Sequence, residues 1–354
     1  MEASASSAAS ARDARRVAVV LPVHNGQQWL DGCMRALLAQ TVLRSRDVAL
    51  EVSAFDDAST DGTWCALGRW AHELELAGMR VTLGRSTRDA PGGCGYAKNR
   101  AVAQCDAEWL CFQDVDDISA PSRVEAELAA AEERPRALVG CQVVREPAGA
   151  TERYIRWANG MGQSQLVHHR FRECTLLMPT WFMARADFVH AGGFREEQCE
   201  DLLLLLAHVA GGGTLHRVDQ PLVTYRYHAS AATHSIPRRL VQRHRAAALE
   251  ADVLRHWPSF SIWGCGRDGR ELFKALSPAA RARVACFVDV DAKKIGVDYV
   301  YGEHRVAVEH WSRVRPPFVT CVALERTGGA FEANLASLCN TLDLAEGTDY
   351  FHFN

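Results

Sequence analysis

The sequence predicts an α/β protein with a mostly parallel sheet, followed by a smaller α/β domain. Apolar runs of strand length alternate with stretches of helical spacing, which is typical of parallel strands joined by crossover helices. Polar and acidic residues gather directly after these runs, where ligands bind in open α/β sheets. A chain of 354 residues also exceeds the usual size of one hydrophobic core, so two domains are expected.

The first domain is expected over residues 17–257, after a disordered tail at residues 1–16 that is rich in Ala and Ser. Its first elements are expected to be a strand at Val17–Pro22, a helix at Trp29–Gln40, and strands at Val48–Phe55 and Trp109–Gln113. Acidic residues follow the second and third of these strands. The candidate ligand site therefore lies at the carboxyl edge of the sheet.

The second domain is expected over residues 258–354. The first domain is expected to end with an Arg-rich helix at Arg238–Trp257, and a new apolar strand begins at Phe260. Further strand-like runs at Val284–Val288 and Pro317–Leu324 are enough for a small Rossmann-like domain.

The composition is that of an ordinary globular protein and excludes several classes. Lys and Arg number 40 against 43 Asp and Glu, a balance of −3, so no overall basic field indicates DNA binding. The 12 cysteines form no C-x-x-C pair, which argues against a zinc ribbon or a redox dithiol. No apolar run approaches the roughly 20 residues that span a bilayer. We therefore expect no membrane or DNA partner and a cytoplasmic location.

Three aspartates, Asp114, Asp116 and Asp117, follow the apolar strand Trp109–Gln113. Carboxylates with this spacing at a strand end can hold a divalent cation, and the cation can bridge the two phosphates of a nucleotide. The alternative interpretation is that they are solvated turn residues.

A second acidic loop begins at Asp56 and Asp57, directly after the strand at Val48–Phe55. A carboxylate here can accept a hydrogen bond from the ring N–H of uracil. Ser59 or Asp61 can instead cap the helix that follows.

A glycine-rich loop runs from Gly92 into a helix that contains Gly95, Lys98, Asn99 and Arg100. Small residues let the backbone approach a nucleotide, and Lys98 or Arg100 can offset the charge of a phosphate. A flexible turn that binds nothing is the alternative.

Glu200 and Asp201 precede the apolar run Leu202–Leu206. A carboxylate buried against such a run would have a raised pKa, which suits a general base, although an acid that caps the helix explains the pattern equally. His228, in the segment Tyr225–His228, is a possible metal ligand or a structural histidine.

Taken in this order, the five motifs resemble the large inverting glycosyltransferase family whose members have the GT-A fold. The resemblance implies a UDP-sugar donor and Mn²⁺ or Mg²⁺ as cofactor. It implies that Asp57 contacts uracil, Asp114 the ribose and Asp116 the metal, and that Asp201 deprotonates the acceptor, with Glu200 as second choice. It also implies that Asp114 and His228 contact the metal. Further contacts with the donor are expected from Pro22, Asp56, Gly95, Lys98 and Asn99.

Five further segments carry a narrower resemblance: Thr151–Trp157, Pro179–Phe182, Arg217–Gln220, Gly328–Phe331 and Phe351–Phe353. They are similar to the galactosyltransferases that act on queuosine in tRNA. This implies transfer of galactose from UDP-galactose to queuosine in the anticodon of tRNA-Tyr. One departure is that the leucines after Asp201 are not followed by the aromatic residues that are expected after them. Transfer from another UDP-sugar, such as UDP-GlcNAc, to a glycan is the alternative.

A tRNA acceptor requires contacts to phosphates, which arginines can supply. The alternative for each is a solvated helix face. Trp157 and Trp181 are possible stacking partners for an anticodon base or, alternatively, buried tryptophans. The candidate phosphate contacts are Arg153, Arg156, Arg170, Arg172, Arg238, Arg239, Arg243 and Arg245.

The second domain carries a rival signal. Gly264, Gly266 and Gly269 form G-x-G-x-x-G after a strand, and Asp289 follows 20 residues later, as in a dinucleotide-binding fingerprint. The rival hypothesis is an NAD-binding oxidoreductase or a nucleotide-sensing module. Only about 95 residues remain for it, roughly half of a complete dinucleotide fold. Otherwise the glycines only allow the helix to pack closely on the strand.

Overall fold

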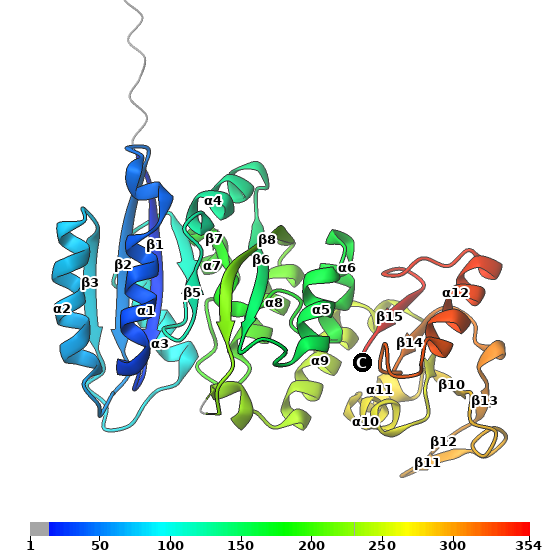
Figure 1. The fold of residues 1–354 in the computed structure, drawn as a ribbon. Coiled ribbons are helices and arrows are strands. Elements are labelled where there is room, and N and C mark those ends of the chain that lie inside the picture. The colour runs from blue at the N-terminus through cyan, green and yellow to red at the C-terminus, as the bar shows by residue number, and fades with distance from the viewer. Residues whose placement is uncertain (1–13, 230) are drawn as a thin grey trace, which may run out of the picture. The chain divides into compact units, whose positions relative to one another are not determined.

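A computed structural model describes residues 14–229 and 231–354 of the chain (Figure 1). Among these residues no helix combines the length and the apolar character needed to cross a bilayer. The chain forms two compact units. Within the described residues, the N-terminal unit comprises residues 14–159, 178–196 and 216–227, and the C-terminal unit comprises residues 160–177, 197–215, 228–229 and 231–354.

The N-terminal unit is built on a sheet of eight strands, counted over the described residues. Across the sheet the strands are β3 (Arg80–Arg85), β2 (Val48–Asp56), β1 (Arg15–Val23), β4 (Trp109–Phe112), β7 (Phe182–Ala184), β6 (Ala137–Glu146), β8 (Thr214–Arg226) and β5 (Ile118–Ser119). The helices and 3₁₀ turns of this part are α1 (Gln27–Leu38), η1 (Thr41–Arg44), α2 (Thr63–Leu76), α3 (Cys94–Ala103), α4 (Arg123–Glu133), α5 (Glu152–Gly160), η3 (Met178–Thr180) and α7 (Arg185–His190).

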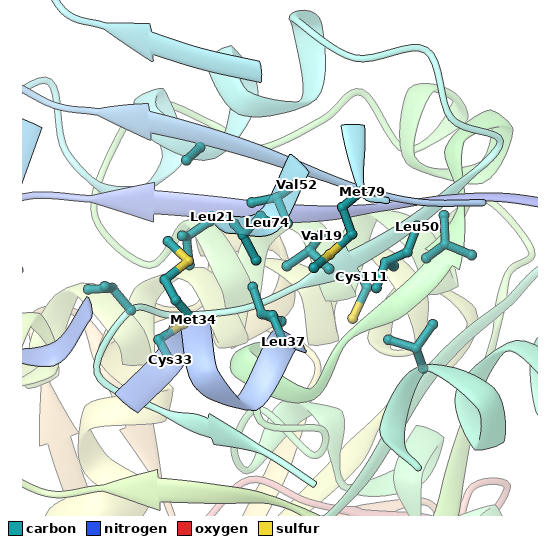
Figure 2. Close-up of a cluster of buried hydrophobic side chains, with 14 of the residues drawn as sticks. Val19, Leu21, Cys33, Met34, Leu37, Leu50, Val52, Leu74, Met79 and Cys111 are labelled. Atoms are coloured by element: carbon teal, nitrogen blue, oxygen red, sulfur yellow. The ribbon is translucent and has the colours of Figure 1, made fainter. Parts of the chain in front are cut away.

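The half of this sheet from β3 to β4 is parallel, as the alternating pattern predicts, whereas β7 pairs antiparallel with both β4 and β6. In β1 the five residues Val17–Leu21 are completely buried, which is typical of a central parallel strand. In α1 the buried residues recur with helical spacing at Leu30, Cys33, Met34 and Leu37. Figure 2 shows this helix face packed against side chains of β1 and β2.

The C-terminal unit contains a parallel sheet of five strands within the described residues, in the order β13 (Val308–His310), β10 (Val284–Asp289), β9 (Phe260–Trp263), β14 (Phe318–Thr320) and β15 (Tyr350–His352). A hairpin joins β11 (Tyr299–Tyr301) to β12 (His304–Val306). The helices and 3₁₀ turns are α6 (Gln163–His168), η2 (His169–Phe171), α8 (Glu200–Ala210), η4 (Ala232–Ser235), α9 (Arg238–Asp252), η5 (Leu254–His256), α10 (Arg267–Ala275), α11 (Pro278–Arg281), η6 (Trp311–Arg313) and α12 (Ala330–Leu342).

The compact units differ from the predicted division at residue 257. Residues 197–215 and helix α9 group with the C-terminal residues. The physical reason is one apolar cluster that contains Leu206 of α8, Leu249 of α9 and Ile262 of β9, all buried. The Arg-rich helix therefore packs with the strands that follow it.

The N-terminal boundary also differs from the prediction. Residues 1–13 of the predicted tail lie outside the described residues. Arg15 and Arg16, which were assigned to that tail, already belong to β1 and pair in register with Val48 and Ala49 of β2.

Candidate active site

Three carboxylates converge in the turn after β4. One carboxylate oxygen from each of Asp114, Asp116 and Asp117 lies within 4.8 Å of the other two. The amide of Asp117 closes the turn by donating to the carbonyl of Asp114, with an N···O distance of 3.2 Å. Mg²⁺ and Mn²⁺ prefer oxygen ligands, so the residues present fit a divalent cation.

Asp117 is the buried member of this acidic turn. Its Oδ1 accepts a hydrogen bond of 2.8 Å from the amide of Arg226, whereas its buried Oδ2 has no hydrogen-bond partner among the described residues. Burial, together with the charges of Asp116 and Asp114, raises the pKa of Asp117 well above its usual range. A cation here would relieve the repulsion and satisfy the buried oxygen.

A buried network fixes the backbone of the acidic turn. The side-chain amide of Gln113 donates to the carbonyls of Asp114 (2.7 Å) and Asp117 (3.1 Å). The fully buried Arg123 donates to the side-chain oxygen of Gln113 (2.8 Å) and to the carbonyl of Phe112 (2.7 Å). Gln113 and Arg123 are thus positioning residues that sequence reasoning missed. The sequence feature that could have indicated them is Gln113 itself, a polar amide directly after an apolar strand.

The loop after β1 joins the acidic turn to the loop after β2. The amide of Asn25 donates to the hydroxyl of Ser59 at 2.8 Å. A Cβ atom on Gly26 would stand only 2.9 Å from a methyl carbon of Val115, so a larger residue here would force this side chain to shift. The loops after β1, β2 and β4 therefore meet at one edge of the parallel strands.

Asp57 holds the glycine-rich loop in place. Its two carboxylate oxygens accept hydrogen bonds from the amides of Gly92 and Gly93, both at 2.8 Å, and its side chain is buried. Each carboxylate oxygen can accept a second hydrogen bond. The predicted contact of Asp57 with uracil would use this remaining capacity, and it stays a prediction.

Asp56 has a structural role in the loop after β2, and its predicted contact with the donor stays a prediction. It is completely buried, and its Oδ1 accepts a hydrogen bond of 3.2 Å from the amide of Ser59. Its Oδ2 lies 3.0 Å from Nε of Arg85, whose guanidinium also donates to the carbonyl of Ser59 (3.2 Å). The charge of Asp56 is therefore compensated inside the protein.

Comparison with known proteins connects this sheet edge to a family. The sequence model of glycosyl transferase family 2 matches residues 18–193, from β1 to beyond α7. Residues 18–193 form a glycosyl transferase family 2 domain. This family 2 domain contains the acidic turn, the loop at Asp57 and the glycine-rich loop, and it has the GT-A fold.

Relatives and solved structures agree with this assignment. An uncharacterized glycosyltransferase of Haemophilus influenzae is 24% identical over 197 residues, 55% of this chain and 69% of that protein. A poly(ribitol-phosphate) beta-glucosyltransferase of Bacillus spizizenii is 28% identical over 102 residues, 29% of this chain and 15% of that protein. The structure of S. aureus TarS 1–349 in complex with UDP-GlcNAc matches with a TM-score of 0.51 and 16% identity, covering 67% of this chain and 66% of that one. The sequence relatives agree with the family 2 assignment, and the structural match shows the GT-A fold.

The remaining predicted donor contacts lie within the family 2 domain. Asn99 of α3 donates to the carbonyl of Phe194 (2.8 Å) and accepts from its amide (3.1 Å), and the ammonium of Lys98 lies 5.1 Å from the centre of the Phe194 ring. Lys98 is buried, as is Gly95 in the first turn of α3, and Pro22 lies near the end of β1. Asn99 and Lys98 therefore fix the segment at Phe194, and their contacts to the donor stay predictions.

Glu200 and Asp201 open α8 in the C-terminal unit. Oδ1 of Asp201 accepts a hydrogen bond of 2.7 Å from the amide of Leu202, at the helix end that favours negative charge. Burial and the charges of Asp201 and Glu200 raise the pKa of Cys199 to about 11. A concentrated negative charge thus marks the start of α8. The assignment of either acid as the base stays a prediction.

His228 also lies in the C-terminal unit. Two clusters with the spacing of metal ligands occur in residues 14–229 and 231–354, and His228 belongs to neither. One cluster is the acidic turn, and the other consists of His169, Glu346 and His352. The metal contact of His228 therefore stays a prediction.

Two of the arginines proposed for tRNA binding are buried, so that prediction is wrong for them. Arg170 pairs with Asp252 at 3.3 Å, and the guanidinium of Arg245 lies 5.2 Å from the ring centre of Phe353. Burial lowers the pKa of both arginines. Trp181 is likewise completely buried. The exposed candidates are Arg153, Arg156, Arg238, Arg239 and Arg243, with Arg172 half-buried.

The glycine turn of the rival hypothesis follows β9 as predicted. A Cβ atom on Gly269 would stand 1.9 Å from the carbonyl oxygen of Gly264, so the glycine allows α10 to pack on the turn. Oδ2 of Asp289 accepts hydrogen bonds from the amide of Cys265 (2.8 Å) and from Lys294 (3.0 Å). The acidic residue of the fingerprint thus binds the turn itself, which favours the packing interpretation over a nucleotide.

Proposed function

We propose that this chain is a metal-dependent inverting glycosyltransferase that moves galactose from UDP-galactose to queuosine in the anticodon of tRNA-Tyr. The observation that carries the proposal is the acidic turn, Asp114–Asp117, inside a family 2 domain. The choice of donor and acceptor rests on the similarity of segments such as Thr151–Trp157 and Phe351–Phe353 to galactosyltransferases that act on queuosine.

The proposed chemistry is a single displacement. The acceptor hydroxyl oxygen bonds to the anomeric carbon as the bond from that carbon to the UDP oxygen breaks, which inverts the configuration. Asp201, with Glu200 as second choice, takes the proton of the hydroxyl. A divalent cation at Asp116 would supply positive charge for the departing diphosphate. Asp57 would orient the uracil ring and Asp114 the ribose.

The direct test is mass spectrometry of nucleosides from queuosine-containing tRNA-Tyr incubated with the full chain, Mn²⁺ and one UDP-sugar at a time. We expect a hexose on queuosine from UDP-galactose only. The Asp116→Asn variant and tRNA that lacks queuosine are the matched controls, and neither should give product. If queuosine stays unmodified with every UDP-sugar, the proposal that queuosine is the acceptor is refuted.

A second candidate is transfer from UDP-GlcNAc to a glycan. The observation that favours it is the structural match to S. aureus TarS, which was solved with UDP-GlcNAc. The rate of donor hydrolysis without an acceptor distinguishes the two candidate functions, because this rate depends on how the enzyme binds the sugar and not on the acceptor. Faster Mn²⁺-dependent hydrolysis of UDP-GlcNAc than of UDP-galactose would favour this second candidate.

A further inference from the structure

The second cluster of possible metal ligands lies entirely in the C-terminal unit. His169 belongs to η2, Glu346 to the loop after α12, and His352 to β15, and one ligand atom of each lies within 4.8 Å of the others. The two imidazoles are 3% and 4% exposed. The proposed glycosyl transfer uses none of these three residues.

The distances between the ligand atoms suit a small ion. Oε1 of Glu346 lies 2.7 Å from Nε2 of His169 and 4.0 Å from Nε2 of His352. In a tetrahedral zinc site with bonds of about 2.0–2.1 Å, neighbouring ligand atoms lie about 3.3 Å apart. The two distances to Glu346 fall on either side of this value, so shifts of roughly 0.7 Å would bring both to tetrahedral spacing, and all three ligand atoms already lie within 4.8 Å of one another.

A buried hydroxyl orients one of the imidazoles. Oγ1 of Thr320 lies 2.6 Å from Nδ1 of His352, and the two residues are in register on the neighbouring strands β14 and β15. When Nδ1–H donates to this hydroxyl, the lone pair of Nε2 is left for a metal. An oxygen partner on the second ring nitrogen is the usual support of a metal-binding histidine.

The loop that carries Glu346 is held by its own hydrogen bonds. The amide of Ala345 donates to the carboxylate of Asp349 (2.9 Å), and the amide of Asp349 donates to the carbonyl of Ala345 (2.9 Å). The amide of Gly347 donates to the carbonyl of Tyr350, also at 2.9 Å. This tight turn places Glu346 beside the imidazoles and reduces the entropy lost when a metal binds.

We propose that His169, Glu346 and His352 bind a divalent transition-metal ion of the zinc type, with water as the fourth ligand. Two imidazoles and one carboxylate favour zinc and its neighbours, whereas the all-carboxylate acidic turn favours Mg²⁺ or Mn²⁺. The ion would tie η2 to β15 within the C-terminal unit. It would therefore stabilise that unit without taking part in sugar transfer.

The test uses the full chain without a polyhistidine tag, in the Asp116→Asn background so that the acidic turn does not contribute. The protein is stripped with a chelator and titrated with Co²⁺ and then with Zn²⁺. We expect one equivalent of bound metal by mass spectrometry, a visible absorption band typical of tetrahedral Co²⁺, and a higher melting temperature. No retained metal and no Co²⁺ band would overturn the proposal.

Variants assign the bound metal to this cluster. His352→Gln and His169→Gln should weaken Zn²⁺ binding by at least about 100-fold, and Thr320→Val by about 10–100-fold. His256→Gln, which alters an exposed histidine of η5, should leave binding unchanged. Equal affinity in Thr320→Val and its parent would also contradict the proposal, and this variant decides the matter if the histidine variants fail to fold.

Discussion

Two aspartates that follow buried parallel strands, Asp117 after β4 and Asp289 at the end of β10, have opposite environments. Asp289 accepts hydrogen bonds from Cys265, Lys294 and Asp291. Burial alone would raise the pKa of Asp289, but these hydrogen bonds lower it. For Asp117, burial and two neighbouring carboxylates raise the pKa, and one oxygen has no hydrogen-bond partner among the described residues.

This difference indicates that Asp289 is a structural residue, whereas Asp117 is a candidate ligand for a cation. The charge of Asp289 is compensated by Lys294, and three hydrogen bonds within the protein leave its carboxylate little capacity to accept one from a nucleotide ribose. The charge at Asp117 is in excess, so a cation gains energy by binding there. Position after a strand alone does not distinguish the two cases, because both residues satisfy it.

The largest expected effect is on catalysis. Asp201→Asn should reduce sugar transfer by about 10²–10⁴-fold, because the loss of a general base removes that much rate, while UDP-sugar affinity stays unchanged. Single-turnover transfer and calorimetry measure the two quantities. Glu200→Gln is the matched control, with a smaller loss. Near-normal transfer in Asp201→Asn would remove it as the base.

Substitution of the satisfied aspartate should affect stability only. Asp289→Asn replaces an acceptor of three hydrogen bonds, so the free energy of unfolding should fall by about 1–3 kcal/mol. Donor binding should not change. Added NAD should produce no shift in melting temperature. A clear stabilisation by NAD would revive the dinucleotide hypothesis.

Substitution at the acidic turn should raise the free energy of unfolding, whereas substitution of Asp289 lowers it. In metal-free buffer, Asp117→Asn removes a buried like charge while Oδ1 can still accept from Arg226, so unfolding should require about 1 kcal/mol more. The same variant should bind Mn²⁺ more weakly. Chemical unfolding with a chelator and Mn²⁺ titration test this pair of effects. Lower stability with unchanged Mn²⁺ affinity would show that Asp117 is as structural as Asp289.

The smallest expected effect is a pH dependence in the network beneath the acidic turn. Complete burial raises the pKa of Glu127 above its ordinary 4.5, although Arg123 acts in the opposite direction. The folded state therefore binds the proton more tightly, and its stabilising contribution, present below pH 4.5, is lost as the pH rises through the folded pKa. Glu127→Gln should flatten this decline in the free energy of unfolding, which we expect to be on the order of 1 kcal/mol.

A matched control for this pH profile is Glu133→Gln at an exposed position of the same helix. It should keep the decline of the parent protein. Chemical unfolding at a series of pH values measures both variants. An identical pH profile in Glu127→Gln and Glu133→Gln would show that the buried Arg123–Glu127 pair does not titrate in this range.

Much of the fold and of the acidic turn could be predicted because the signal is local. The buried runs at β1 and β4 and the spacing of Asp114, Asp116 and Asp117 lie in short windows of sequence. What could not be predicted depends on distant partners. Lys294 neutralises Asp289, and nothing in the G-x-G-x-x-G pattern indicates this pairing.

The burial of two arginines could not be predicted from the sequence for the same reason. Arg245 is covered by Phe353, more than 100 residues away, and Arg170 pairs with Asp252 in another helix. Such contacts form only when helices and strands pack, so an arginine on an apparently polar helix cannot be placed from helical spacing alone.

The central claim is that the acidic turn holds a cation that binds the nucleotide. Calorimetric titration of UDP with and without Mn²⁺ tests it most directly, on the parent chain, Asp116→Asn and Asp289→Asn. We predict Mn²⁺-dependent UDP binding in the parent and in Asp289→Asn, and its loss in Asp116→Asn. UDP affinity that is equal with and without Mn²⁺ in the parent, or unchanged in Asp116→Asn, would contradict the claim.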